Sequence, residues 1–395
     1  MNAKDILTRA KELLPDIIDI RRDLHRHPET GFDLNYTLEK VKTELEKIGI
    51  NYKLCGKAGI IADLGDLSKE AIILRSDMDA LPITEEADID YKSETPGKMH
   101  GCGHDTHIAM LLGAAKILKE NENHIKGHIR LVFQPAEEIF KGSLDMIENG
   151  SLDGVKAAMM LHSLTGYPIP EGTLMVLTGG IRMSSCEQYH ITVKGKGGHG
   201  SNPHMAVDPI TAAAHVHIAL QEINAREMDP KGFAVFTTGK FIAGNVSNVI
   251  PDKAEMFGTI RTNDPTGKTG DMIKKRISEI AKGVAMAFRC EAETEFFDAV
   301  PCMVVDDSLS KSALGYMKEL YGDSVIAVDD SGGGSEDFAF VSHKVPTISM
   351  MLSVGDANNG YCYGLHNPKA RFNDDYLWMG TAAYTQMGLK WCEEN

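Results

Sequence analysis

The sequence predicts an α/β fold in which a mixed, mostly parallel sheet is flanked by helices and accompanied by a smaller α+β unit. Three observations support this prediction. Short apolar runs alternate with helical stretches in the first part of the chain. Several of these runs are followed within a few residues by acidic or imidazole side chains. A middle segment has a different order of elements, and the alternating pattern returns after it.

Length and composition limit the classes of protein that the chain can belong to. A chain of 395 residues exceeds one ordinary core, so we expect two domains. The formal net charge of -15 argues against nucleic acid and anionic membrane surfaces as partners. No membrane span or signal peptide is evident, and we expect a cytoplasmic protein. Seven scattered cysteines argue against a disulfide framework.

The first part of the chain alternates between the two periodicities. Helical spacing of apolar residues covers residues 3–26, 35–47 and 106–119. Buried strands are expected at 71–75, 128–133 and 157–161. Strands separated by helices in this way are typical of a mostly parallel sheet with helices on its faces.

The pattern of the middle segment predicts a compact sandwich of one sheet and two helices. Strands are expected at residues 189–193, 234–241, 246–250, 254–260 and 291–297, and helices at 207–223 and 269–287. The alternating pattern then returns, with helices at 309–320 and 374–390, a strand at 346–351, and a glycine-rich loop at 331–335.

The densest group of chemically active side chains lies between Met99 and His107. Cys102 and His104 are two residues apart within a glycine-rich stretch, a spacing that lets a thiolate and an imidazole face one metal. We expect a helix to start after His104 with Asp105 as its cap. The alternative is a metal-free loop that happens to contain several histidines.

Further polar side chains follow the predicted strands. Asp77 and Asp79 come after the first strand, Glu137 and Glu138 after the second, and His162 after the third. Each has an ordinary explanation taken alone: a solvated turn, surface charge or a structural histidine. Because open α/β sheets place their sites at the carboxyl ends of strands, the succession favours a metal-dependent site.

The chain resembles the aminoacylase/hippurate hydrolase branch of the co-catalytic zinc exopeptidases, which includes N-acetyl-diaminopimelate deacetylases and auxin-conjugate hydrolases. The resemblance runs through nearly the whole chain. Its motifs are Arg21–His25 with His27-Pro28-Glu29, Ser76–Pro82, Met99–His107, Gln134–Glu138, Gly197–Gly200 with Pro203-His204, Glu336-Asp337-Phe338 and Leu365–Pro368.

The resemblance implies a role for each matching position. Cys102 is expected to bridge two divalent ions, and the other ligands are His104, Glu138, His162 and His366. Glu137 is expected to act as general base. Asp79 is expected to orient one of the ligands, with His104 as the favoured one. This donor set suits zinc, cobalt, nickel or manganese better than magnesium or calcium.

The resemblance also implies the arrangement of the domains. Residues 1–182 and 298–395 are expected to form one discontinuous catalytic domain, with 183–297 as an inserted lid that dimerises. His199 is expected to stabilise the oxyanion in the neighbouring subunit's site. Asn248 and Arg261 are expected to bind the amide and the α-carboxylate of the substrate.

The expected function is metal-dependent hydrolysis of the amide bond of small N-acyl amino acids such as N-acetyl or N-benzoyl derivatives. A dipeptidase or carboxypeptidase with similar metals is the alternative within the hydrolases. A non-catalytic binding protein should have lost a ligand or the base, and a cysteine-nucleophile enzyme fits the acidic strand ends poorly. Ile181 and the 331–335 loop depart from the usual pattern, which leaves the preferred acyl and amino acid groups open.

Overall fold

The computed structural model describes residues 1–395 and divides into two compact units. The outer unit comprises Met1–Arg182, Val304–Asp330 and Asp337–Asn395. The middle unit comprises Met183–Met303 and Ser331–Glu336. The chain therefore enters and leaves the middle unit twice, the second time through the short glycine-rich loop.

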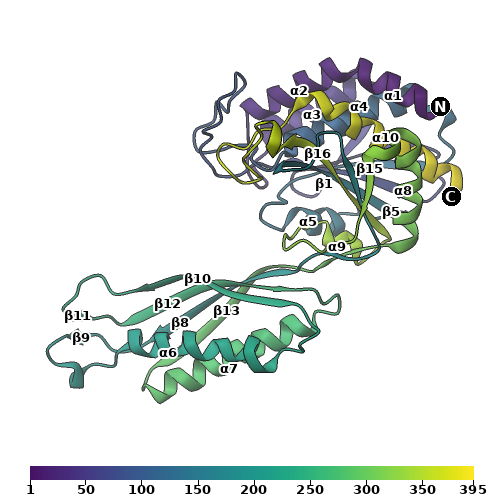
Figure 1. The fold of residues 1–395 in the computed structure, drawn as a ribbon. Helices are drawn as coiled ribbons and strands as arrows, with labels where there is room; N and C mark the ends of the chain where they lie inside the picture. Colours follow the sequence, from purple (N-terminus) through teal and green to yellow (C-terminus); the bar gives the residue numbers. More distant parts are fainter. The chain divides into compact units, whose positions relative to one another are not determined.

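An eight-stranded mixed sheet forms the centre of the outer unit, in the order β1-β2-β4-β3-β5-β16-β6-β15 (Figure 1). Its strands are β1 (Tyr52–Cys55), β2 (Gly59–Gly65), β3 (Ala71–Asp77), β4 (His128–Gln134), β5 (Val155–Tyr167), β6 (Leu174–Leu177), β15 (Val325–Val328) and β16 (Thr347–Asp356). The four neighbours β4, β3, β5 and β16 run parallel, so their carboxyl ends lie at one edge.

Helices cover both faces of this sheet. They are α1 (Ala3–Glu12), α2 (Leu14–Arg26), α3 (Asn35–Lys47), α4 (His104–Glu120), α5 (Gly142–Glu148), α8 (Asp307–Tyr321), α9 (Ala339–Ser342) and α10 (Leu377–Glu394). Helices α4 and α10 pack against each other and on the central strands, whereas α5 and α9 contact each other beyond the opposite face (Figure 1). These layers confirm the predicted α/β class with a mostly parallel sheet.

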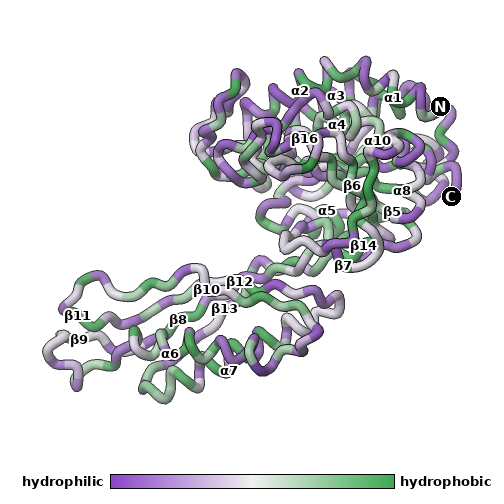
Figure 2. The backbone as a smooth tube through the Cα atoms, in the orientation of Figure 1, coloured by the Kyte–Doolittle hydropathy of each residue, from purple (hydrophilic) through white to green (hydrophobic).

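The burial of the central elements explains their sequence pattern. Every residue of β3 and of β4 is buried, as expected for parallel strands covered on both faces. Helix α4 is also buried on nearly all sides, and its sequence accordingly lacks a polar face. In Figure 2 the hydrophobic colour gathers on inner segments such as β6 and β8.

The middle unit has its own antiparallel sheet, in the order β10-β12-β8-β13. The strands are β8 (Cys186–Lys194), β10 (Ala234–Ala243), β12 (Lys253–Thr262) and β13 (Glu291–Val300). Helices α6 (Pro209–Glu222) and α7 (Lys268–Ala287) pack on it around a separate apolar core. Strands β9 (Gly198–His199) and β11 (Val249–Ile250) form a small two-stranded sheet. Strands β7 (Gly180–Met183) and β14 (Met303–Val305) form another, where the chain passes from one unit to the other.

Some predicted elements differ from the structure. The helix predicted over 3–26 is two helices, because α1 ends at Glu12 and α2 starts at Leu14 with Pro15 in its first turn. The strand predicted over 246–250 keeps only its last two residues. Strands β1, β2, β6 and β15 were not predicted, because three of them have only four residues and weak periodicity.

The boundaries of the units also differ slightly from the predicted ranges. The middle unit starts at the predicted residue 183 but extends to 303, past the predicted 297, because β13 continues beside β8 up to Val300. The loop 331–336 clusters with the same unit, where Ser184 N–H donates to Gly334 O at 3.0 Å. No helix of the chain combines the length and the apolarity that crossing a membrane requires.

Candidate metal centre

The predicted site residues of the outer unit converge at the carboxyl edge of the parallel strands. Asp79 follows β3, and Glu137 with Glu138 follows the neighbouring β4. His162 lies within β5, on the other side of β3, two residues beyond the last β5 residue that pairs with β3. The predicted third strand therefore does not end at His162 but continues to Tyr167.

The metal loop, residues 99–107, includes the first turn of helix α4. The helix begins at His104, and Gly103 precedes it in the left-handed conformation with φ +86°. Asp105 is thus a residue of the first turn and not the predicted cap. Its carboxylate instead contacts Arg21 and His25 of α2. A side chain on Gly103 would collide with the ring of Phe372. Because glycine has none, the loop can lie close to the segment that contains Phe372.

The five predicted ligands form two overlapping groups. Cys102, His104 and His162 offer ligand atoms within 4.8 Å of one another, as do Cys102, Glu138 and His366. Cys102 Sγ lies 3.4 Å from His162 Nε2, and Glu138 Oε1 lies 3.6 Å from His366 Nε2. Cys102 is the residue common to both groups, which is the position that a bridging thiolate needs.

The orientation of the histidines fits metal binding. His104 donates from Nδ1 to the carbonyl oxygen of Asp79 at 2.7 Å, so its Nε2 carries the lone pair. This Nε2 is buried and has no hydrogen-bond partner. His162 likewise uses Nδ1 for the carbonyl of Ser163, at 2.7 Å. Burial lowers the pKa of His104 well below its usual value and that of His162 to about 3, so both rings are neutral, as ligands must be.

Asp79 holds the turn that carries the two glutamates. Its carboxylate accepts hydrogen bonds from the backbone amides of Glu137, at 2.9 Å, and Glu138, at 3.3 Å. The expected contact with His104 is made by the Asp79 carbonyl, while the carboxylate lies 3.8 Å from His104 Nδ1. Burial, opposed by the Glu137 amide and reinforced by Asp77, raises the pKa of Asp79 to about 8. Ala136 starts the same turn at φ 55°, an uncommon conformation for a residue with a Cβ.

Two residues beside the ligands were not assigned a role from the sequence. His107 Nδ1 lies 2.6 Å from Asp77 Oδ1, and His107 Nε2 accepts from the amide of Ser163 at 2.8 Å. This bridge ties α4 and β3 to the residue after His162. The sequence could have indicated a role for His107, because it lies one turn after His104 and therefore on the same face of the helix.

Asp77 is itself held by a buried guanidinium. Arg75 donates to Asp77 Oδ2 at 2.7 Å and to Gln134 Oε1 at 3.0 Å, and its other nitrogen lies 3.3 Å from Asp337 Oδ1. Burial raises the pKa of Asp77, but His104, Arg75 and His107 outweigh it and lower that pKa well below its usual value. Asp337, from the Glu336-Asp337-Phe338 motif, therefore helps to hold Arg75, which in turn holds Asp77.

The three predicted residues of the middle unit lie on its surface or at its loops. His199 and Asn248 are neighbours, because β9 pairs with β11 and Gly200 N–H donates to Asn248 O at 2.8 Å. Ser201 N–H donates to His199 Nδ1 at 3.1 Å, which leaves the proton of the exposed ring on Nε2. Arg261, on β12, donates to Ser335 Oγ at 2.7 Å and to Gly333 O at 3.2 Å.

The residues present fit a pair of divalent ions. The donor set is one thiol, three imidazoles and one carboxylate, which are zinc-type ligands. The unpartnered Nε2 of buried His104 is an observation that bound metal explains directly. A thiolate and a carboxylate as ligands would leave a net positive charge on two divalent ions, which suits stabilisation of an oxyanion.

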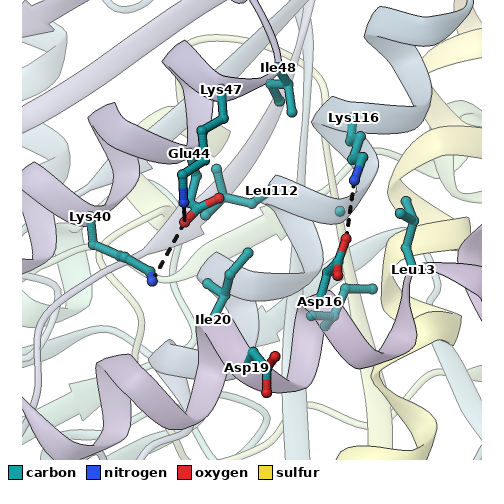
Figure 3. A pocket seen from close by; sticks show the side chains of 12 residues that line it. Leu13, Asp16, Asp19, Ile20, Lys40, Glu44, Lys47, Ile48, Leu112 and Lys116 are labelled. Carbon is teal, nitrogen blue, oxygen red and sulfur yellow. Dashed lines mark hydrogen bonds and ion pairs between the residues drawn. The ribbon is translucent and has the colours of Figure 1, made fainter.

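Another hollow in the outer unit lacks such chemistry. It has a volume of 420 Å³ and lies among α2, α3 and α4, away from the metal loop (Figure 3). Its charged side chains largely pair with one another, since Lys116 contacts Asp16 at 3.1 Å and Glu44 contacts Lys40 and Lys47. It contains no histidine or cysteine and offers no reacting group.

Fold and donor set together are those of a metal-dependent hydrolase. The family model described as Peptidase family M20/M25/M40 matches residues 73–390. The chain therefore belongs to this family and is an amidohydrolase.

Three relatives illustrate the range of the family. An "IAA-amino acid hydrolase ILR1-like 2" of Arabidopsis thaliana is 35% identical over 98% of this chain and 87% of its own length. An "N-acetyl-L-cysteine deacetylase" of Bacillus subtilis is 36% identical over 87% of this chain and 83% of its own. A "Thermostable carboxypeptidase 2" of Saccharolobus solfataricus is 35% identical over 96% of both chains.

Solved structures agree with the fold. A putative aminohydrolase from methicillin-resistant Staphylococcus aureus superposes with a TM-score of 0.88, at 31% identity over 98% of this chain and 99% of that chain. A protein of Bacillus subtilis described as a dinuclear metal binding peptidase from the M20 family gives 0.79, at 30% identity over 97% of this chain and 99% of that chain. The resemblance inferred from the sequence motifs is thus confirmed at the level of the family.

Proposed function

We propose that the chain hydrolyses the amide bond of small N-acyl amino acids with two divalent metal ions. The observation that carries the proposal is the Glu137-Glu138 turn, which Asp79 holds beside the group of Cys102, His104, His162 and His366. The carboxylates of Glu137 and Glu138 both lie within 4.8 Å of a His104 nitrogen, so one can serve as ligand while the other stays available for proton transfer. The relatives named as an N-acetyl-L-cysteine deacetylase and an IAA-amino acid hydrolase support N-acyl amino acids as the substrate class.

The metal ions and the side chains around them have different roles in the proposed reaction. Bound ions would polarise the amide carbonyl and acidify the attacking water. Glu137 takes the proton from this water and delivers it to the leaving amine. Glu137 is buried, and the amide of Asp337 lies 3.4 Å from its Oε1, so its carboxylate keeps a defined direction. His366 is the accessible ligand, with 54% of its side chain exposed.

The middle unit is proposed to supply the substrate-binding groups. His199 Nε2–H is an exposed donor of the kind that stabilises an oxyanion in a partner subunit. Arg261 offers the planar fork that binds an α-carboxylate, and Asn248 lies beside His199 as an amide-binding group. A lid of residues 183–297 and a cytoplasmic location remain predictions.

Dimerisation through the middle unit is part of the same proposal. Strand β10 is an edge strand, and Val235, Phe241 and Ile242 on it are exposed by 40%, 43% and 44%. Ile218 on α6 is 66% exposed. An unpaired edge bearing apolar side chains favours pairing with a second copy.

A carboxypeptidase or dipeptidase activity is the second candidate, and it is favoured by the carboxypeptidase relatives of similar identity. The two differ in the group on the acyl side of the scissile bond, where a dipeptide carries a charged amine and an N-acyl amino acid does not.

Release of free amine from N-acetyl, N-benzoyl and dipeptide substrates separates these functions. The protein is stripped of metal and resupplied with zinc, cobalt, nickel or manganese. The proposal expects metal-restored cleavage of acyl amino acids at rates above those of dipeptides. Preferred cleavage of dipeptides would replace it by the peptidase function, and no cleavage despite two bound ions would refute both.

A further inference from the structure

A buried ionic cluster lies behind the metal loop and has no role in the proposed reaction. Its centre is Arg21 of α2, of which 1% of the side chain is exposed. Arg21 Nε lies 2.9 Å from Asp105 Oδ2, and Arg21 Nη1 lies 3.3 Å from Asp374 Oδ1. Asp105 directly follows His104, whereas Asp374 belongs to the segment that follows His366. One guanidinium therefore joins two of the parts of the chain that carry ligands, the metal loop and the segment after His366.

These two parts also touch each other next to the ligands. The amide of His366 donates to the carbonyl of Gly101 at 2.9 Å. Phe372 packs over Gly103, where an added Cβ would lie 2.7 Å from its Cε1. The position of His366 relative to Cys102 thus depends on how firmly the segment 366–374 is held against the loop.

Groups of opposite charge face one another in the cluster. His25 places Nδ1 2.8 Å from Asp105 and Nε2 3.1 Å from Glu85, and Arg22 Nε lies 2.8 Å from Asp374 Oδ2. Three carboxylates face Arg21, Arg22 and a histidine whose two nitrogens both point at acceptors. Such pairing of opposite charges is what permits them to be buried.

We propose that Arg21 is a positioning residue for the metal ion that Cys102, Glu138 and His366 hold, an inference that rests on the proposed function. The group of Cys102, His104 and His162 comes from the metal loop and β5, whose mutual position is maintained by His107 and Asp77. The group with His366 additionally needs the C-terminal segment. Arg21 links this segment to α4, so its loss should weaken one ion and spare the other.

Metal titration of the stripped protein tests the inference. Binding of Zn²⁺ is measured by equilibrium dialysis, and binding of Co²⁺ by its absorption spectrum, for the unmutated protein, Arg21→Met and Asp374→Asn. We expect the first ion to bind unchanged. The affinity of the second should fall about 10- to 100-fold, as for other residues that orient metal ligands. The cobalt spectrum should change only in the second equivalent.

Arg130→Met is the matched control. Arg130 is also a buried arginine paired with an aspartate and near a histidine, since Asp63 lies 2.7 Å from it and 2.8 Å from His128. This second cluster joins β2 to β4 and contains no ligand segment. Its loss should destabilise the fold without changing either metal affinity.

The outcomes are distinct. If Arg21→Met does not fold, Asp374→Asn decides, because it keeps the Arg21–Asp105 pair and removes only one charge of the link. Unchanged affinity for both ions in the folded variants, or an equal loss of both, would overturn the inference. Fewer than two ions on the unmutated protein would instead refute the proposed function on which it rests.

Discussion

The histidines around the metal loop show how burial decides the chemistry of single residues. Burial, together with the nearby His107, lowers the pKa of His162 to about 3, and burial lowers the pKa of His100 to about 4. These rings are therefore neutral at any pH at which the protein is expected to work. Metal ions meet ligands that do not first have to lose a proton from an imidazole.

The low pKa of His162 predicts the acid sensitivity of the metal-free protein. The ordinary pKa of histidine is about 6.5, so between pH 6 and 4.5 the unfolded chain binds a proton at this residue and the folded chain does not. Acidification therefore lowers the free energy of unfolding, by up to about 1.4 kcal/mol per pH unit for this residue.

In His162→Gln this contribution should disappear, and the dependence of stability on pH should become shallower by about that amount. Urea unfolding at several pH values between 6 and 4.5 measures it. Replacing the exposed His204 by glutamine is the control and should leave the slope unchanged. Equal slopes for His162→Gln and the unmutated protein would show that His162 is protonated in the folded state.

Glu137 and Glu138 are adjacent but should respond differently to the same substitution. Glu137→Gln should retain two metal ions and lose turnover roughly 10²- to 10⁴-fold, because the amide cannot accept the proton of water. Glu138→Gln should instead weaken metal binding. Metal content and kcat of both variants are measured together, and full turnover of Glu137→Gln would remove it from the mechanism.

At the scale of elements, the start of α4 is the most constrained point of the site. Gly103 has φ +86° and faces the ring of Phe372, so both its backbone and its lack of a side chain are required. Strands β3 and β4 end just before Asp79 and Glu137, and His162 lies within the parallel strand β5, so the three strands bring these side chains to one edge.

Gly103→Ala should therefore be more harmful than an equivalent change elsewhere. The left-handed conformation costs alanine about 1–2 kcal/mol, and crowding against Phe372 adds roughly 1–3 kcal/mol. Gly97 also has a positive φ, of 75°, but nothing lies within 4 Å of an added Cβ, so Gly97→Ala should lose only the first contribution. Urea unfolding compares the two, and equal losses would mean that Phe372 moves aside freely.

At the scale of the whole molecule, the chain contains two separate apolar cores. One surrounds the mixed sheet, and the other is formed by β8, β12, α6 and α7 within the middle unit. Division into two domains follows from the length of the chain, since one core of this size is uncommon.

The proposed dimer is tested on the edge of the middle unit. Ile242→Lys on β10 places a charge among exposed apolar side chains and should convert a dimer into a monomer. Ile326→Lys on β15, the edge strand of the outer sheet, is the control, because Ile326 is 43% exposed and should not change the mass. Light scattering after size-exclusion chromatography reports the mass. A dimer that survives Ile242→Lys would place the interface elsewhere.

Sequence patterns were sufficient for the long elements and for the identity of the polar residues at strand ends. The helix at 35–47 has the predicted bounds, and β3 and β4 extend the predicted ranges by two residues and by one. Periodicity is informative in such elements because each turn or pair of residues repeats the same burial. The four-residue strands β1, β6 and β15 escape it, since they offer too few repeats and depend on their neighbours in the sheet.

The amino-acid sequence by itself determined the α/β class, the family and the set of five candidate ligands, because these depend on residue type, spacing and local periodicity. Only the tertiary structure showed that Asp79 binds the Glu137-Glu138 amides, that His107 bridges Asp77 and Ser163, and that Arg21 joins Asp105 to Asp374. Each of these contacts joins residues far apart in the chain, and local sequence carries no record of which distant partner a buried polar group meets. Burial of polar groups requires such partners, and folding brings them together.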